Sequence, residues 1–164
     1  MARDDLHRLI GLLDEAYFGP AWHGPSLRGA LRAVTPAQSL WRPAPGRHNI
    51  WELAVHAAYW KYTVRRQVLG LKPGSFAEKG SNWFDRTPAA SGSTLVAAWR
   101  RDRAALEREH RKLREALLAF PAADLDRKPP SGRHSWRRMI AGVALHDVYH
   151  AGQIQLLKRL AGRR

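Results

Sequence analysis

The sequence predicts an all-α protein, a four-helix bundle with a long crossover connection between the second and third helices. Four stretches repeat apolar residues with the 3.6-residue period of a helix, and no stretch shows the alternation expected of a strand. Residues 71–91 contain prolines, glycines and scattered polar residues, which indicates a long loop between the second and third helical stretches. Four long helices with otherwise short connections are typical of a bundle.

The first helix carries one apolar stripe, and two Gly-Pro pairs at residues 19–20 and 24–25 interrupt the pattern after it. Ser26 then begins a short helix over residues 27–34. Thr35 begins a further short turn, because a proline follows at the first helical position and a glutamine at the third. The stripe of the first helix consists of Leu6, Leu9, Ile10, Leu13 and Tyr17.

Three longer helices follow. The second long helix covers about residues 50–69, because Asn49 and Glu52 form a capping box and Gly70 ends the pattern. The third runs from Ser93 to the residue before Pro121, and the fourth runs from Ser135 to Leu160. One stripe of the third helix holds Leu95, Trp99, Asp102, Leu106, Leu113 and Leu117.

One loop sequence occurs twice. Residues 42–49 read Arg-Pro-Ala-Pro-Gly-Arg-His-Asn, and residues 127–135 read Arg-Lys-Pro-Pro-Ser-Gly-Arg-His-Ser. Each leads directly into a helical stretch with a tryptophan at or next to its start, Ile50-Trp51 in the first case and Trp136 in the second. We interpret this as two similar halves, in which the helices that follow the two loops start level with each other.

The length of 164 residues predicts a single domain over residues 1–164. No apolar run is long enough to span a membrane, and the first ten residues carry charges where a signal peptide needs an apolar stretch, so we expect a cytoplasmic protein without a membrane partner. The absence of cysteine excludes disulfides, thiolate metal ligands and a cysteine nucleophile.

The chain is strongly basic, with 28 Lys and Arg residues against 14 acids and a formal net charge of +14. Such a charge favours anions, nucleic acid or an acidic surface as partners. Only six of the basic residues are lysines, as expected from a GC-rich genome that encodes arginine in place of lysine, and no nucleic-acid-binding motif is present. We therefore expect no specific nucleic-acid partner. Seven basic residues lie on the third helix, diluted by glutamates: Arg100, Arg101, Arg103, Arg108, Arg111, Lys112 and Arg114.

Three histidines occupy apolar faces of two helices. His146 and His150 lie four residues apart in the apolar stripe of the fourth helix, which places both side chains on one inward face. His56 lies on the inner face of the second long helix. Buried imidazoles need partners, and neutral imidazole is a common ligand of Zn²⁺ and Ni²⁺. Two interpretations remain: a three-histidine divalent-metal site with an open position, or buried histidines that hydrogen-bond to each other, to tyrosine or to backbone.

The positions of these histidines along their helices create a tension. If the two helices start level, His56 lies seven residues into one helix and His146 eleven residues into the other. Four residues correspond to about 6 Å of helical rise. The helices must then be staggered or tilted for the three imidazoles to meet.

His56, after a Gly-Arg-His loop, and the run His-Asp-Val-Tyr-His-Ala-Gly-Gln at residues 146–153 resemble the DinB-like (DinB/YfiT) metalloprotein superfamily. The resemblance extends from Leu6 to Leu160 and implies a DinB-like bundle with a divalent metal ion held by His56, His146 and His150. Members of this superfamily are commonly dimeric. Those with assigned activities include S-transferases and isomerases that use low-molecular-weight thiols such as bacillithiol or mycothiol, and others are described as metal-dependent hydrolases.

Several neighbours of the histidines have alternative roles. Asp147 either accepts a proton from an imidazole or pairs at the surface with an arginine. Gln153 either touches the site or braces the bundle, and the hydroxyls of Tyr59 and Tyr149 either approach a substrate or pack. Glu52 is explained by capping. Residues 80–84, Gly-Ser-Asn-Trp-Phe, either line the mouth of a pocket or plug one end of the bundle.

The remaining histidines are interpreted without a metal. His48 and His134 serve the two similar loops, and His7, His23 and His110 are surface or packing residues.

Two classes of function follow. The first is a metal-dependent enzyme, a thiol-dependent S-transferase or isomerase or a hydrolase, acting on a small molecule; its thiol must come from a cosubstrate because the chain has no cysteine. The second is a basic bundle that binds nucleic acid or another anion and whose metal is structural or absent.

Overall fold

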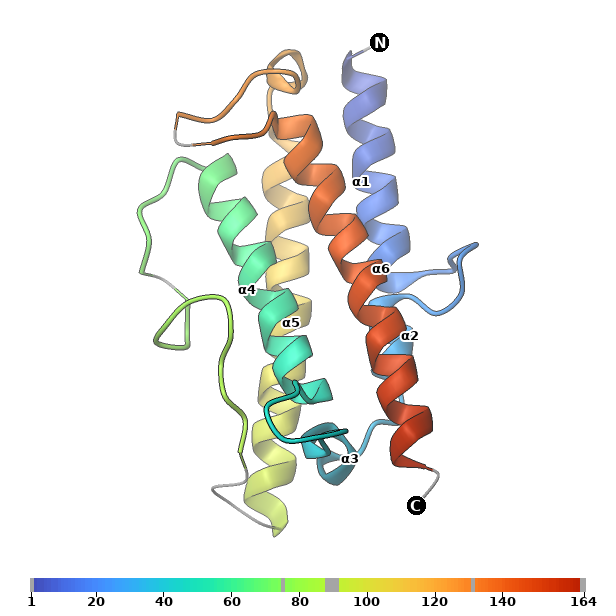
Figure 1. Cartoon of the computed structure of the whole chain (residues 1–164). Coiled ribbons are helices and arrows are strands. Elements are labelled where there is room, and N and C mark those ends of the chain that lie inside the picture. Colours follow the sequence, from blue (N-terminus) through green and yellow to red (C-terminus); the bar gives the residue numbers. More distant parts are fainter. Residues whose placement is uncertain (1, 75, 88–91, 131, 163–164) are drawn as a thin grey trace.

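The computed structural model describes residues 2–74, 76–87, 92–130 and 132–162, and every regular element in these ranges is a helix. This confirms the predicted all-α class (Figure 1). The elements are α1 (Ala2–Phe18), α2 (Leu27–Ala30), α3 (Pro36–Leu40), α4 (Ile50–Val68), α5 (Gly92–Leu118), the 3₁₀ turn η1 (Ala122–Asp124) and α6 (Trp136–Ala161).

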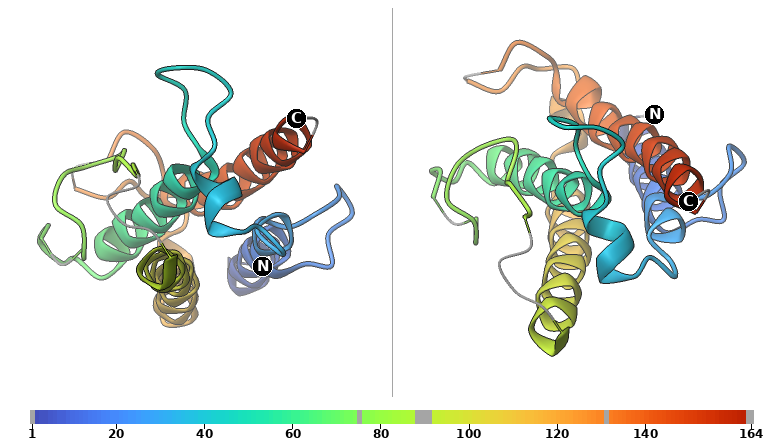
Figure 2. Two further views of the ribbon diagram at one scale, coloured as in Figure 1. Left: turned by 90° about the horizontal axis from the view of Figure 1, so that it is seen from below. Right: turned by 60° about the horizontal axis from the view of Figure 1, so that its bottom comes forward.

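Four long helices form the bundle; in Figure 1 the short helix α3 lies at its lower end, and α2 lies between α3 and the end of α1. In that view α4 and α5 run upward, whereas α1 and α6 run downward. Residues 69–74 and 76–87 pass along the outer side of α4. From below, α1 and α5 are seen nearly end-on, whereas α4 and α6 lie obliquely (Figure 2). The expectation that α4 and α6 start level is wrong, because they start at opposite ends of the bundle.

The helix starts follow the sequence signals. The Asn49 and Thr35 side chains accept hydrogen bonds from the backbone N–H groups of Glu52 and Gln38, which completes a capping box in each case. Ser135 caps α6 in the same way, by accepting from the N–H of Arg138. The two similar loops therefore each end on a cap; Ser131, like residues 75 and 88–91 of the long loop, lies outside the described residues.

The short helix expected over residues 27–34 is only four residues long. It ends because the backbone of Ala33 has a φ of +59°, in the left-handed region, which breaks the helical hydrogen-bond pattern. Val34 beyond it is nevertheless buried, and its carbonyl accepts a hydrogen bond from the Trp99 indole of α5. The segment thus packs as a turn that closes the lower end of the bundle.

The core divides into two apolar clusters. One surrounds α4 at the lower end and includes Trp51, Trp99 and Ile154. The other fills the upper end between α1, α5 and α6 and includes Leu13, Leu113 and Ile140. The helices α4 and α6 contribute residues to both clusters. The three histidines and several buried charged side chains lie on these two helices. Among the described residues no helix is both long and apolar enough to cross a membrane.

Candidate metal centre

The three candidate ligands meet between α4 and α6. His56 comes from α4, and His146 and His150 come from successive turns of α6. The Nε2 atom of His146 lies 3.0 Å from Nε2 of His56 and 2.9 Å from Nε2 of His150. One nitrogen from each residue lies within 4.8 Å of the other two. Because α4 and α6 run in opposite directions, the rings meet without the stagger that a level start would require.

Hydrogen bonds at the far side of two rings orient their Nε2 atoms. His56 Nδ1 lies 2.7 Å from the carbonyl oxygen of Asn82, and His150 Nδ1 lies 2.6 Å from Oε1 of Gln153. A carbonyl oxygen only accepts, so both Nδ1 atoms must be the protonated donors. In the neutral rings the Nε2 atoms of His56 and His150 therefore carry lone pairs that point toward His146.

This arrangement fits a bound cation better than a self-contained hydrogen-bond network. His146 Nε2 carries at most one proton, which satisfies one of the two facing lone pairs and leaves the other unpaired. His146 Nδ1 is buried and has no hydrogen-bond partner among the described residues. A divalent ion would accept all three lone pairs, and two nitrogen ligands of a tetrahedral Zn²⁺ lie about 3.4 Å apart, close to the spacing seen here.

The three rings are neutral at physiological pH. Burial, together with the nearby His150, His56 and Lys61, lowers the pKa of His146 to about 3. Burial likewise lowers the pKa of His150 to about 4 and lowers the pKa of His56, although hydrogen bonds to Gln153 and Asn82 act in the opposite direction. Neutral imidazole is the form that coordinates metals, so the rings require no deprotonation near neutral pH.

The loop after α4 covers the site. Asn82 has a φ of +66°, a left-handed conformation that asparagine tolerates, and this directs its carbonyl toward His56. Its side-chain oxygen accepts a hydrogen bond of 3.0 Å from the indole of Trp60. Trp83 stacks between two imidazoles, 3.8 Å from the His56 ring and 3.6 Å from the His48 ring. Of the two interpretations of residues 80–84, lining a pocket is confirmed for Asn82, whereas Trp83 stacks on the imidazoles and does not line the cavity beside them.

Glu52, one turn before His56, anchors this loop. Its carboxylate accepts hydrogen bonds from the Arg42 guanidinium and the backbone N–H of Arg86, and it also contacts the His48 ring. Burial raises the pKa of Glu52, but these hydrogen bonds outweigh it and hold the pKa at about 2. The predicted capping role is confirmed, and the loop contacts add to it.

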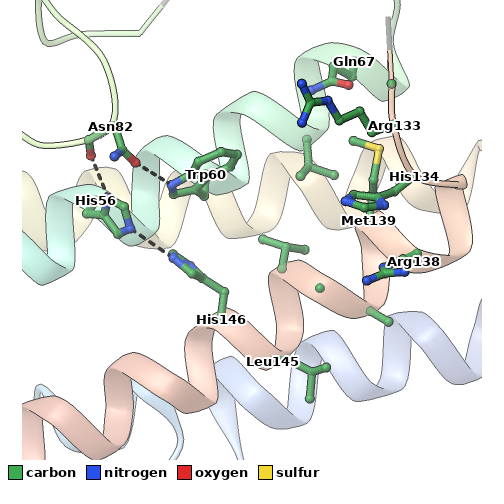
Figure 3. Close-up of a pocket in the computed structure, with 15 residues that line it drawn as sticks. His56, Trp60, Gln67, Asn82, Arg133, His134, Arg138, Met139, Leu145 and His146 are labelled. Carbon is green, nitrogen blue, oxygen red and sulfur yellow. Dashed lines mark hydrogen bonds between the residues drawn. The ribbon is translucent and has the colours of Figure 1, made fainter. Parts of the chain in front are cut away.

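A cavity of about 780 Å³ opens beside the histidines. It runs between α4 and α6 to the loop before α6, and His56 and His146 line one end (Figure 3). Its walls are mostly apolar, from residues such as Trp60, Val64 and Met139. The size is within the range of small-molecule sites. His150 is only 2% exposed, so a ligand would reach the centre from the side of His56 and His146.

Both interpretations of Asp147 were wrong. Its side chain is fully buried and pairs with Lys61 of α4, which is also fully buried, and among the described residues it forms no hydrogen bond or ion pair with an imidazole or an arginine. Gln153 touches the site through His150. Tyr59 packs among aromatic side chains that include Phe76 and Phe84, and Tyr149 is 63% exposed.

The other histidines have separate environments. His48 stacks on Trp83, and His134 lines the far end of the cavity. His110 is fully buried in the core, where it stacks on Tyr17 at 4.2 Å. His7 and His23 are exposed.

The basic residues of α5 do not act as one surface. Four of them form an ion pair with a carboxylate, which partly neutralises their positive charge. These four are Arg101, Arg111, Lys112 and Arg114.

Fold and site together define a helical bundle with three converging neutral histidines beside an open cavity. The sequence model of the DinB superfamily matches residues 22–154. The chain belongs to the DinB superfamily, whose members typically bind metal. Neither the curated proteins nor the solved structures that were compared with the chain gave a match.

Proposed function

We propose that this chain is a metal-dependent enzyme in which His56, His146 and His150 hold a divalent ion, Zn²⁺ or Ni²⁺. The observation that carries the proposal is the convergence of three imidazole nitrogens, two of them with tautomers that direct a lone pair inward. Three protein ligands leave a position for a further ligand, as in catalytic rather than structural zinc sites. The cavity that reaches His56 and His146 gives access to that position.

The reaction class that we propose is transfer or isomerisation with a low-molecular-weight thiol as cosubstrate, with hydrolysis as the alternative. A bound divalent ion would supply Lewis acidity, which favours a thiolate or hydroxide over the neutral form near neutral pH. The chain has no cysteine, so the thiol comes from outside. Gln153 and the Asn82 carbonyl orient two ligands through their Nδ1–H groups, and Trp83 stacks on the His56 ring.

Metal analysis of the purified, untagged protein tests the ligand set. We expect about one divalent ion per chain and near-complete loss in His150→Ala, because removing one of three ligands removes most of the affinity. His7→Ala is the matched control, since this histidine is exposed on α1. Circular dichroism checks that both variants fold. Full occupancy in folded His150→Ala would contradict the assignment.

Substitution with Co²⁺ tests the open position. A low-molecular-weight thiol should change the visible spectrum and produce sulfur-to-metal charge transfer in the near ultraviolet, and the His150→Ala variant should show neither change. If the spectrum responds to neither thiol, carboxylate nor pH, the ion is closed to solvent and a structural role replaces the enzymatic one.

We further propose a homodimer formed through α6. Tyr149 and Leu156 are 58–63% exposed, and with Gly152 they follow the alternating three- and four-residue spacing of a helix-packing seam on a part of α6 that does not line the cavity. Light scattering during gel filtration should give a dimer mass that falls to the monomer mass in Leu156→Lys. Leu118→Lys, at an exposed position of α5, is the control and should leave the mass unchanged. A monomeric wild-type protein would contradict this.

A further inference from the structure

The cavity beside the histidines has two chemically different ends. His56 and His146 line one end, and Arg133, His134 and Arg138 line the other (Figure 3). Arg138 lies eight residues before His146 on α6, which corresponds to a separation of about 12 Å along the helix axis. The cavity therefore extends well beyond the immediate surroundings of the candidate metal centre.

The far end carries uncompensated positive charge. No acidic side chain lines the cavity, and within the described ranges neither Arg133 nor Arg138 forms an ion pair. Neighbouring arginines outside the cavity do form ion pairs: Arg127 contacts Asp124, and Arg137 contacts Asp126 at 2.7 Å. The local carboxylates thus neutralise the arginines outside the cavity and leave those at its rim available.

The segment between the two ends is apolar. Trp60 and Val64 form the α4 side, and Met139 and Val143 form the α6 side. A polar chain that crossed this segment would lose hydration without finding hydrogen-bond partners. A hydrocarbon or aromatic body gains from burial there, and only its two ends meet polar groups.

We propose that the substrate of this site is an amphipathic carboxylate, with an apolar body of about 12 Å and a metal-binding donor at the end opposite the carboxylate. Arg133 and Arg138 bind the carboxylate, and planar guanidinium groups suit it because they can donate two parallel hydrogen bonds. This inference rests on the proposed function, since it places the donor at the open position of the ion held by the histidines.

A series of ω-mercapto acids tests the proposal without a known substrate. The spectrum of the Co²⁺-substituted protein reports thiolate binding at the ion, so a titration gives the affinity of each compound independently of activity. We expect 11-mercaptoundecanoic acid to bind at least tenfold more tightly than 11-mercapto-1-undecanol, because charge-assisted hydrogen bonds to the carboxylate are lost in the alcohol. We expect 3-mercaptopropionic acid to bind at least tenfold more weakly, because it is too short to reach the arginines.

Arginine variants locate the carboxylate. Arg138→Gln and Arg133→Gln should each weaken 11-mercaptoundecanoic acid about tenfold and leave 11-mercapto-1-undecanol unchanged. Arg127→Gln is the matched control, because it removes the same charge from an exposed arginine outside the cavity. Arg138→Lys, which keeps the charge, should recover part of the affinity.

Two results overturn the inference in distinguishable ways. If acid and alcohol bind equally, or if Arg127→Gln weakens the acid as much as Arg138→Gln does, the cationic end does not select a carboxylate and the inference alone fails. If no thiol changes the spectrum, the proposed open position fails and the inference fails with it.

Discussion

Replacing Lys61 with methionine should destabilise the protein strongly. Lys61 and Asp147 are both fully buried and pair across the α4–α6 interface. The second carboxylate oxygen, Oδ1 of Asp147, is buried with no hydrogen-bond partner among the described residues. Removal of Lys61 therefore leaves the Asp147 carboxyl group buried in the core without a partner among the described residues. Breaking a buried pair on one side costs about 3–5 kcal/mol.

The size of this loss is measurable. For a domain of this length, 1 kcal/mol shifts the melting temperature by about 2–4 °C, so Lys61→Met should melt about 6–20 °C below the wild type. Urea denaturation should show a lower midpoint with an unchanged slope, since the surface exposed on unfolding is the same. The double variant Lys61→Met/Asp147→Leu should recover most of the loss, because apolar replacement of both partners is often neutral.

The loss in Lys61→Met should also depend on pH. Burial raises the pKa of Asp147, and Lys61 opposes that rise, so the pKa increases further in the variant. A carboxyl group whose pKa is higher in the folded state than its unfolded value near 3.9 stabilises the fold below that value, and this contribution is lost as pH rises toward the folded pKa. The variant should therefore be less destabilised at pH 5 than at pH 8. A cost below about 1 kcal/mol that is equal at both pH values would refute a buried ion pair.

Further predictions concern the core and the site. Burial lowers the pKa of His110 to about 2, so the wild type should lose about 2 kcal/mol more than His110→Gln between pH 6.5 and 4.5, as urea denaturation would show. Asn82→Ala should be about 1 kcal/mol less stable than Asn82→Gly, because only glycine adopts the left-handed φ freely; equal stabilities would refute this. Gln153→Leu should weaken metal binding about 10–100-fold in competition with a chelator, and Gln153→Glu should retain it. Binding of DNA should be weak, with a Kd of about 10⁻⁴–10⁻⁶ M, and should fall steeply with salt; a sequence-preferring complex that survives physiological salt would contradict this.

The helices and the three histidines could be predicted because their signals are local. Apolar periodicity and caps determine α4 and α6, and residues spaced by one turn share a face, so the positions of His146 and His150 follow from the sequence. The convergence with His56 needed only the assumption that inward faces meet in a bundle. The opposite directions of α4 and α6 did not follow, since two similar loop sequences carry no information about which end of the bundle they occupy.

The buried pair could not be predicted for a physical reason. A lysine one turn after an inward residue is usually solvated, and an aspartate between two histidines invites a role beside them. Lys61 and Asp147 instead pair with each other, although they lie 86 positions apart in the sequence. The only available signal was complementarity, an acid and a base each on an otherwise apolar face of two different helices.

The surroundings of the candidate centre depend on Glu52 as much as on the ligands themselves. Its buried carboxylate holds the loop through the Arg86 N–H and contacts His48, whose ring stacks on Trp83. Trp83 in turn stacks on His56. A residue that local sequence explains fully as a helix cap therefore also supports the aromatic cover of a ligand one turn away. Sequence patterns can identify the nitrogen atoms that would bind an ion. The side chains that surround those atoms are determined by contacts between segments that lie far apart in the sequence.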